Sequence, residues 1–147
     1  MTYKTYPSTP LNVVLLQVNY SSAQQARDIV TEFVKTSLTL ADAGWGGYVY
    51  FDTTAFQLGF ITPNISQENA IAIIAPFFSF VNNATRAVTE VIPFDSFYTA
   101  FQVLFSGSGQ VGTNAELSSR LIPRTIIEQN PGKVAETLLS LNGVMWK

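Results

Sequence analysis

The 147-residue chain contains neither cysteine nor histidine. Without cysteine it has no thiol nucleophile, disulfide or thiolate metal ligand. Without histidine it has no Ser-His-Asp triad and lacks the commonest side-chain ligand of transition metals. A general base would have to be a carboxylate or tyrosine with a shifted pKa, and no two carboxylates are spaced as acid-base partners. The sequence therefore predicts no autonomous catalysis and no tightly held metal or cofactor.

Charge is also scarce, at 12% of the residues, about half the usual share. Eight basic residues in no basic run, a net charge of −2 and a pI of ≈ 4.9 argue against nucleic-acid and anionic-membrane partners. No apolar run approaches the ~20 residues of a membrane span, since Pro76 interrupts the longest, Ala70 to Phe78. Hydrophobic residues, at 47%, suffice for the core of one domain over residues 1–147.

The N-terminal ten residues have no hydrophobic signal region. Sequons at Asn19, Asn64 and Asn83 are candidate glycosylation sites and fit a secretory history. Such triplets also arise by chance in a chain rich in Ser, Thr and Asn. The chain is therefore cytosolic, has lost a leader, or is a piece of a longer protein, and the sequons favour secretion over the cytosol.

Hydrophobic periodicity predicts the first elements. Residues Leu11 to Tyr20 form a strand with apolar residues on both parities, which is typical of a central strand buried on both faces. Ser22 begins a helix with a capping-box pattern, and Gly44 ends it. The stretch AGWGGYVYFDTTAFQLGF, Ala43 to Phe60, then predicts two strands joined by a tight turn.

A second helix starts after Ser66, with Pro76 expected to kink or shorten it. A fourth strand, a short third helix, a polar loop and a last helix follow, over Ala87 to Phe94, Phe97 to Phe105, Ser106 to Asn114, and from Asn130 onward. The second helix is expected to face the core with Ala70, Ile74, Phe78 and Val81, and the last, capped by Asn130, with Val134, Leu138 and Leu141.

Residues 1–94 therefore run β-α-β-β-α-β, the ferredoxin-like order of an α+β fold. We expect a four-stranded antiparallel sheet in spatial order 4-1-3-2 or a close relative, with the first strand central and the helices on one face. Residues 95–147 would form a C-terminal helical and loop extension.

The letters GSGQVG, Gly107 to Gly112, match the dinucleotide-binding pattern G-x-G-x-x-G. That pattern needs a preceding strand and a surrounding parallel βαβ unit, whereas the preceding segment here has helical spacing. A mobile loop explains these glycines better than a phosphate-binding loop.

The two faces of the predicted sheet differ in chemistry. The helices should cover the first set of residues: Val14, Leu16, Val18, Val49, Phe51, Phe56, Leu58 and Phe60. The opposite set mixes rings and amides with a glycine: Gln17, Asn19, Tyr48, Tyr50, Gln57, Gly59 and Ile61. This second set lacks the Lys, Arg and Glu of an ordinary solvated face. It suits a platform for a small molecule or glycan, or a partner interface, unless the C-terminal 50 residues cover it.

Four short motifs follow one another along nearly the whole chain: KTYP from Lys4, ADAGWGGY from Ala41, FDSFYTAF from Phe94 and SRLIPR from Ser119. In this combination the chain resembles the substrate-binding (cap) domain of fungal FAD-linked oxidases of the berberine-bridge-enzyme type. Trp45, Tyr98 and Arg120 are motif positions in this resemblance. It implies a sheet whose open face lies over the flavin ring of another domain. The FAD-binding domain and its flavin-attaching residue have no counterpart in this sequence.

Two functions follow from these observations. The first is a stand-alone, cofactor-free binding protein derived from an oxidase substrate domain, which covers its open face by forming a homodimer through Tyr48 or Tyr50. The second is a fragment or subunit of an FAD-linked oxidoreductase that acts on alcohols or sugars. The sequence favours the first, because Met1 comes shortly before the first predicted strand and Gly143 follows the last predicted helix, which is what we expect of an independent unit.

Overall fold

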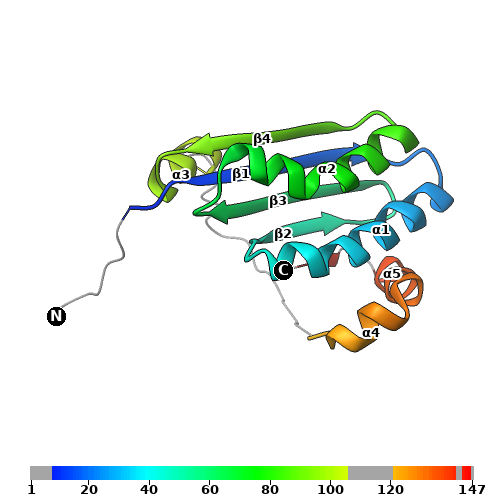
Figure 1. Cartoon of the computed structure of the whole chain (residues 1–147). Helices are drawn as coiled ribbons and strands as arrows, with labels where there is room; N and C mark the ends of the chain where they lie inside the picture. The colour runs from blue at the N-terminus through cyan, green and yellow to red at the C-terminus, as the bar shows by residue number, and fades with distance from the viewer. Residues whose placement is uncertain (1–7, 106–120, 142–143, 147) are drawn as a thin grey trace, which may run out of the picture.

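The computed structural model describes residues 8–105, 121–141 and 144–146. They form an α+β fold in which helices pack on an antiparallel sheet (Figure 1). Its elements are β1 (Leu11–Asn19), α1 (Ala23–Asp42), β2 (Gly46–Phe51), β3 (Ala55–Pro63), α2 (Gln67–Ala84), β4 (Val88–Phe94), α3 (Phe97–Phe105), α4 (Arg124–Gln129), α5 (Pro131–Leu139) and β5 (Val144–Trp146).

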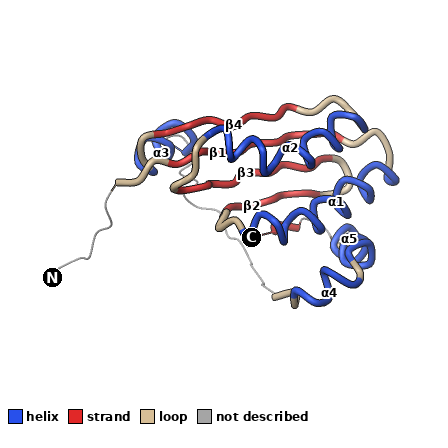
Figure 2. The backbone as a smooth tube through the Cα atoms, in the orientation of Figure 1, coloured by secondary structure: helices blue, strands red, loops and turns tan. Residues whose placement is uncertain are grey.

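The strands are ordered β4-β1-β3-β2-β5, and Figure 2 shows the first four side by side in that order. Every neighbouring pair is antiparallel. This confirms the expected 4-1-3-2 order. The central position of β1 is also confirmed, since Val14 pairs with Phe60 on one side and Val91 on the other. The short β5 extends the sheet beyond β2 and was not predicted, because three residues are too few to carry a periodic signal.

Helix α1 begins and ends as the sequence indicates. The Ser22 hydroxyl accepts a hydrogen bond from the Gln25 amide at 3.1 Å, which satisfies one of the free donors of the first turn. After the helix ends at Asp42, Gly44 has a φ of +75°, a left-handed conformation that glycine adopts without a steric penalty.

Helix α2 corrects two expectations. It continues through Pro76 for 18 residues, so of the two expected effects of the proline, a kink or a shorter helix, the shorter helix is not observed. The buried side chains Ile74, Phe77 and Val81 hold the helix on the sheet, which offsets the ~3 kcal/mol that an interior proline costs. Phe78 was expected to face the core; it is half-buried against the core, and its neighbour Phe77 is the fully buried ring of this turn.

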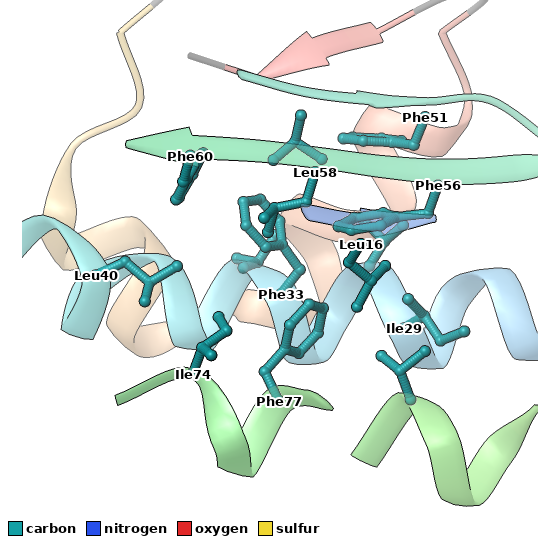
Figure 3. Close-up of a cluster of buried hydrophobic side chains, with 14 of the residues drawn as sticks. Leu16, Ile29, Phe33, Leu40, Phe51, Phe56, Leu58, Phe60, Ile74 and Phe77 are labelled. Atoms are coloured by element: carbon teal, nitrogen blue, oxygen red, sulfur yellow. The ribbon is translucent and has the colours of Figure 1, made fainter. Parts of the chain in front are cut away.

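The core lies between the sheet and helices α1 and α2. Figure 3 shows Phe33 of α1 at its centre, between strand residues on one side and α2 on the other. The ring centroid of Phe33 lies 5.3 Å from that of Phe56 and 6.0 Å from that of Phe77. All eight side chains expected on this face are buried: Val14, Leu16, Val18, Val49, Phe51, Phe56, Leu58 and Phe60.

The extension divides between the two faces of the sheet. Helices α4 and α5 pack beside α1, where Arg124 bonds Asp42 with both terminal nitrogens, at 2.6 and 2.9 Å. Helix α4 was not predicted, and Asn130 makes no side-chain cap hydrogen bond to α5. Of the residues expected to face inward, Val134 is buried and Leu138 half-buried. Leu141 is exposed because it follows the end of the helix.

Strand β4 is an edge strand of the sheet. The side-chain amide of Gln67 donates to the Val91 carbonyl oxygen at 2.8 Å, so part of the strand's outer edge already has a partner. No helix among the described residues is both long and apolar enough to span a membrane.

Candidate functional site

The strand register groups the residues of the second face into cross-strand rows, because directly paired residues point to the same side. Two neighbouring rows cross β4, β1, β3 and β2 in that order. The first contains Val88, Gln17, Gln57 and Tyr50, and the second contains Glu90, Leu15, Gly59 and Tyr48. We call these two rows, with Asn19 beside the first, the open face.

Helix α3 covers the other end of this side of the sheet. Its Ala100 is buried with Leu11 and Val13 of β1, and Leu15, Ile61, Phe94 and Leu104 pack around them. Of the three alternatives for the second face, a ligand platform, a partner interface or cover by the C-terminal 50 residues, the third thus holds for one end of the face. Ile61 is on the expected side of the sheet but is half-buried in this cluster.

The two tyrosines of the open face are exposed to solvent. Tyr48 is 41% exposed and Tyr50 53% exposed, and their rings are stacked with centroids 6.4 Å apart at 29°. Gln17, Gln57 and Asn19 are exposed as well. These five side chains thus lie on one accessible surface, with rings on β2 and amides on β1 and β3.

The open face is nearly uncharged. Glu90, on the edge strand, is the one ionisable carboxylate of its two rows, and neither row contains Lys or Arg. Basic side chains form ion pairs on the helices instead: Lys35 with Glu32, Arg124 with Asp42 and Glu128, and Lys133 with Glu136. Tyrosine rings and amides of this kind bind uncharged ligands through ring contacts and hydrogen bonds.

Three members of the open face were absent from the residues singled out in the sequence. Val88 is 63% exposed in the first row, and Glu90 and Leu15 belong to the second. The alternation along V-T-E-V-I assigns Val88 and Glu90 to one side of their strand. It does not say with which residues of β1 they pair.

The motif positions of the family resemblance lie apart from the open face. Trp45 is 8% exposed in the core under the helices, and its indole nitrogen has no hydrogen-bond partner in the described structure. Tyr98 is exposed on α3, where its hydroxyl accepts from the side chain of Gln102 at 2.9 Å. Arg120 and the GSGQVG segment lie outside the described residues.

The three sequons are all accessible, since Asn19, Asn64 and Asn83 are exposed. Asn64 has a left-handed φ of 59° in the turn after β3. Asn19 lies at the margin of the open face, so a glycan there would cover part of this surface.

Two shifted pKa values occur at the β2–β3 turn: that of Asp52 in the turn, and that of Tyr20, which follows β1 and whose amide donates to the Thr54 carbonyl oxygen at 2.8 Å. The Thr54 hydroxyl, with the amides of Thr54 and Ala55, lowers the pKa of the Asp52 carboxyl. Burial, together with the nearby Asp52 charge, raises the pKa of Tyr20, so this phenol stays protonated at neutral pH. Both effects fit a structural turn, and neither group belongs to the open face. No group of three or more acidic side chains in the described part of the chain is arranged to hold a metal.

Comparison with known proteins links this architecture to flavoproteins. No family model matches the chain. It is 28% identical over 138 residues to an uncharacterized FAD-linked oxidoreductase of Arthroderma benhamiae, an alignment covering 88% of this chain and 24% of the relative. The chain therefore resembles one part of an FAD-linked oxidase.

Solved structures agree at the level of the fold. The VAO-type flavoprotein MtVAO615 of Myceliophthora thermophila superposes with a TM-score of 0.77 at 16% identity, over 90% of this chain and 26% of its own. MtVAO713 of the same organism gives a TM-score of 0.69 at 17% identity, over 88% and 25%. The chain thus spans about a quarter of each protein. The resemblance to a partial domain of an oxidase, expected from the sequence motifs, is confirmed.

Proposed function

We propose that this chain is the substrate-side part of an FAD-linked oxidoreductase and that its open face binds an alcohol or a sugar. The flavin would be carried by a separate part of the enzyme. The observation that carries the proposal is an accessible, nearly uncharged surface of stacked tyrosines and amides. It lies on a fold that matches about a quarter of the length of an FAD-linked oxidoreductase and of a VAO-type flavoprotein.

The side chains of the open face suit a flat ring with hydroxyl groups. Tyr48 and Tyr50 offer ring faces and phenolic hydroxyls, and Gln17 and Gln57 each offer a donor and an acceptor. This chemistry fits the substrate and the ring of a flavin equally well.

The same residues do not fit the diphosphate of FAD. A diphosphate requires basic side chains or the N-terminus of a helix after a glycine-rich turn, and the two rows contain neither. The chain's contribution would therefore be to bind and orient substrate and to exclude water. A bound flavin would supply the acceptor of the substrate's hydride.

Ligand titration followed by NMR tests this proposal. The probes are 4-hydroxybenzyl alcohol, cellobiose and riboflavin, which present an aromatic alcohol, a sugar and a flavin ring without the diphosphate. We expect saturable shifts confined to β1, β2 and β3 with at least one probe, and about three- to tenfold weaker binding to Tyr50→Ala.

Phe80→Ala is the matched control, because Phe80 is an exposed ring on α2, on the other side of the sheet. It should bind the probes like the wild type. No saturable binding of any probe, or equal binding by the wild type and Tyr50→Ala, would overturn the proposal.

Self-association is a second candidate function, favoured by the exposure of Val88, Tyr48 and Tyr50 on one face. A homodimer packed face to face would cover these side chains with an identical surface related by a two-fold axis. The chain would then be a stand-alone binding protein without a cofactor. Light scattering distinguishes the two candidates, since a dimer has twice the 16.1 kDa mass of the chain.

A further inference from the structure

Two glycines of the β2–β3 hairpin, Gly47 and Gly59, differ in what the fold requires of them. A Cβ at Gly47 would collide with the carbonyl oxygen of Gly59 and with the ring of Phe60. Because backbone and a buried ring cannot move aside, glycine is required there for packing alone.

Gly59 has no such requirement. Its φ is not in the left-handed region, and among the described residues a Cβ there would meet only Leu15 Cδ2, at 3.9 Å, an ordinary van der Waals distance. Other residues would therefore fit at this position of β3 without strain. A glycine inside a strand weakens the sheet, so its presence without a steric cause points to the close approach of another group.

A neighbouring aromatic ring is one group that commonly covers such a glycine. The cross-strand partner of Gly59 is Tyr48, yet no Tyr48 atom lies within 4 Å of the would-be Cβ. The Tyr48 ring is stacked with that of Tyr50 instead. Gly59 is half-buried in its strand, but within the described structure no ring lies over it on the open face; we call this stretch between Leu15 and Tyr48 the bare backbone.

We propose that Gly59 is a specificity-determining residue, and that the bare backbone between Leu15 and Tyr48 is the seat of the ligand's ring. The inference rests on the proposed function and adds where the ring lies. The ligand is an uncharged, hydroxylated six-membered ring, flat enough to lie on the strand.

The neighbouring row supplies the polar contacts of this seat. Gln17 and Gln57 are two residues along their strands from Leu15 and Gly59, which is about 6.6 Å in an extended chain. A hydroxyl at the edge of a ring over Gly59 lies within reach of their amides. The ring hydroxyls of a sugar and the benzylic or phenolic hydroxyl of an aromatic alcohol present this same chemistry.

Substitution of Gly59 tests the seat with the same two probes, 4-hydroxybenzyl alcohol and cellobiose. Gly59→Val places a branched side chain where the ring would lie, so we expect binding about tenfold weaker or more, with a smaller loss in Gly59→Ala. The thermal midpoint should equal or exceed that of the wild type, because valine favours strands. The probe that binds more tightly to the wild type identifies the ligand as an aromatic alcohol or a sugar.

Gly46→Val is the control, since Gly46 is a strand glycine with open space around it, in the row of Ile61. It should bind within about twofold of the wild type. Wild-type affinity in Gly59→Val, or an equal loss in Gly46→Val, would overturn the seat while leaving the proposed function intact. A large drop in the thermal midpoint of Gly59→Val would mean that glycine serves the fold, and would also overturn it. Absence of binding of all three probes, riboflavin included, to the wild-type chain would overturn both.

Discussion

On the helix-covered side of the sheet, Leu16, Leu58 and Val49 form a cross-strand row that is at most 3% exposed. One residue along each strand, the row of Gln17, Gln57 and Tyr50 is exposed on the open face. The same strands therefore carry buried core side chains on one parity and the exposed rings and amides of the proposed ligand surface on the other. Substitutions at adjacent positions should separate the two properties.

The largest difference is expected between Phe56→Ala and Gln57→Ala. Phe56 is fully buried and contacts the rings of Phe33, Phe51 and Phe77, so its truncation should cost about 3–5 kcal/mol of unfolding free energy. Gln57→Ala should change it by less than about 0.5 kcal/mol. Chemical denaturation of both variants measures the contrast, and similar losses would mean that the open face also stabilises the fold.

A smaller effect on unfolding free energy is expected where α3 covers one end of the second face, next to the open face. Ala100 of α3 is 1% exposed against Leu11 and Val13. Ala100→Glu would bury a charge or lift the helix, at a cost of about 1–3 kcal/mol. Gln102→Glu, on the exposed side of α3, is the control. Thermal melting that is the same for both variants would show that α3 is not seated on the sheet.

For self-association the expected change is in mass rather than stability. If the open faces pair, Tyr50→Glu should convert the dimer to a 16.1 kDa particle at micromolar concentration, because like charges would face each other across the two-fold axis. Its unfolding free energy as a monomer should stay within about 0.5 kcal/mol of the wild type. Sedimentation of both proteins decides the matter, and a dimer that persists in Tyr50→Glu would place the interface elsewhere.

The smallest effect is expected in the hairpin turn that joins β2 to β3. The pKa of Asp52 is lowered by the Thr54 hydroxyl and backbone amides, so its ionised form stabilises the folded state. That contribution is complete above the unfolded pKa of about 4 and is lost as the pH falls through the lower folded pKa.

Asp52→Asn should therefore lower the thermal midpoint at pH 7 and differ less from the wild type at pH 3. Thr54→Val, which removes the hydroxyl donor, should show the same trend more weakly. A difference between Asp52→Asn and the wild type that does not change with pH would assign the effect to the shape of the turn.

The fold and the open face could be predicted because both depend on parity. The run of apolar residues on both sides of β1 indicated a central strand, and the alternation from Tyr48 to Ile61 separated rings and amides from the core. These signals are local and extend over whole strands.

Features that depend on pairing between distant segments could not be predicted in the same way. The place of Val88 and Glu90 beside Gln17 and Leu15 is set by the register of β4 on β1. The position of α3 on the second side follows from the fit of Ala100 between Leu11 and Val13. The uncovered state of Gly59 depends on where the Tyr48 ring turns. None of these leaves a periodic mark in the sequence.

The edge of β4 restricts how two molecules can meet. Gln67 already bonds the outward-facing carbonyl of Val91, and the next outward position, Pro93, has no N–H to offer. A strand from another molecule that approached this edge would find its ladder of backbone hydrogen bonds interrupted at consecutive rungs. The protein is thereby guarded on this side against growth into a continuous intermolecular sheet, the geometry from which amyloid-like fibrils are built.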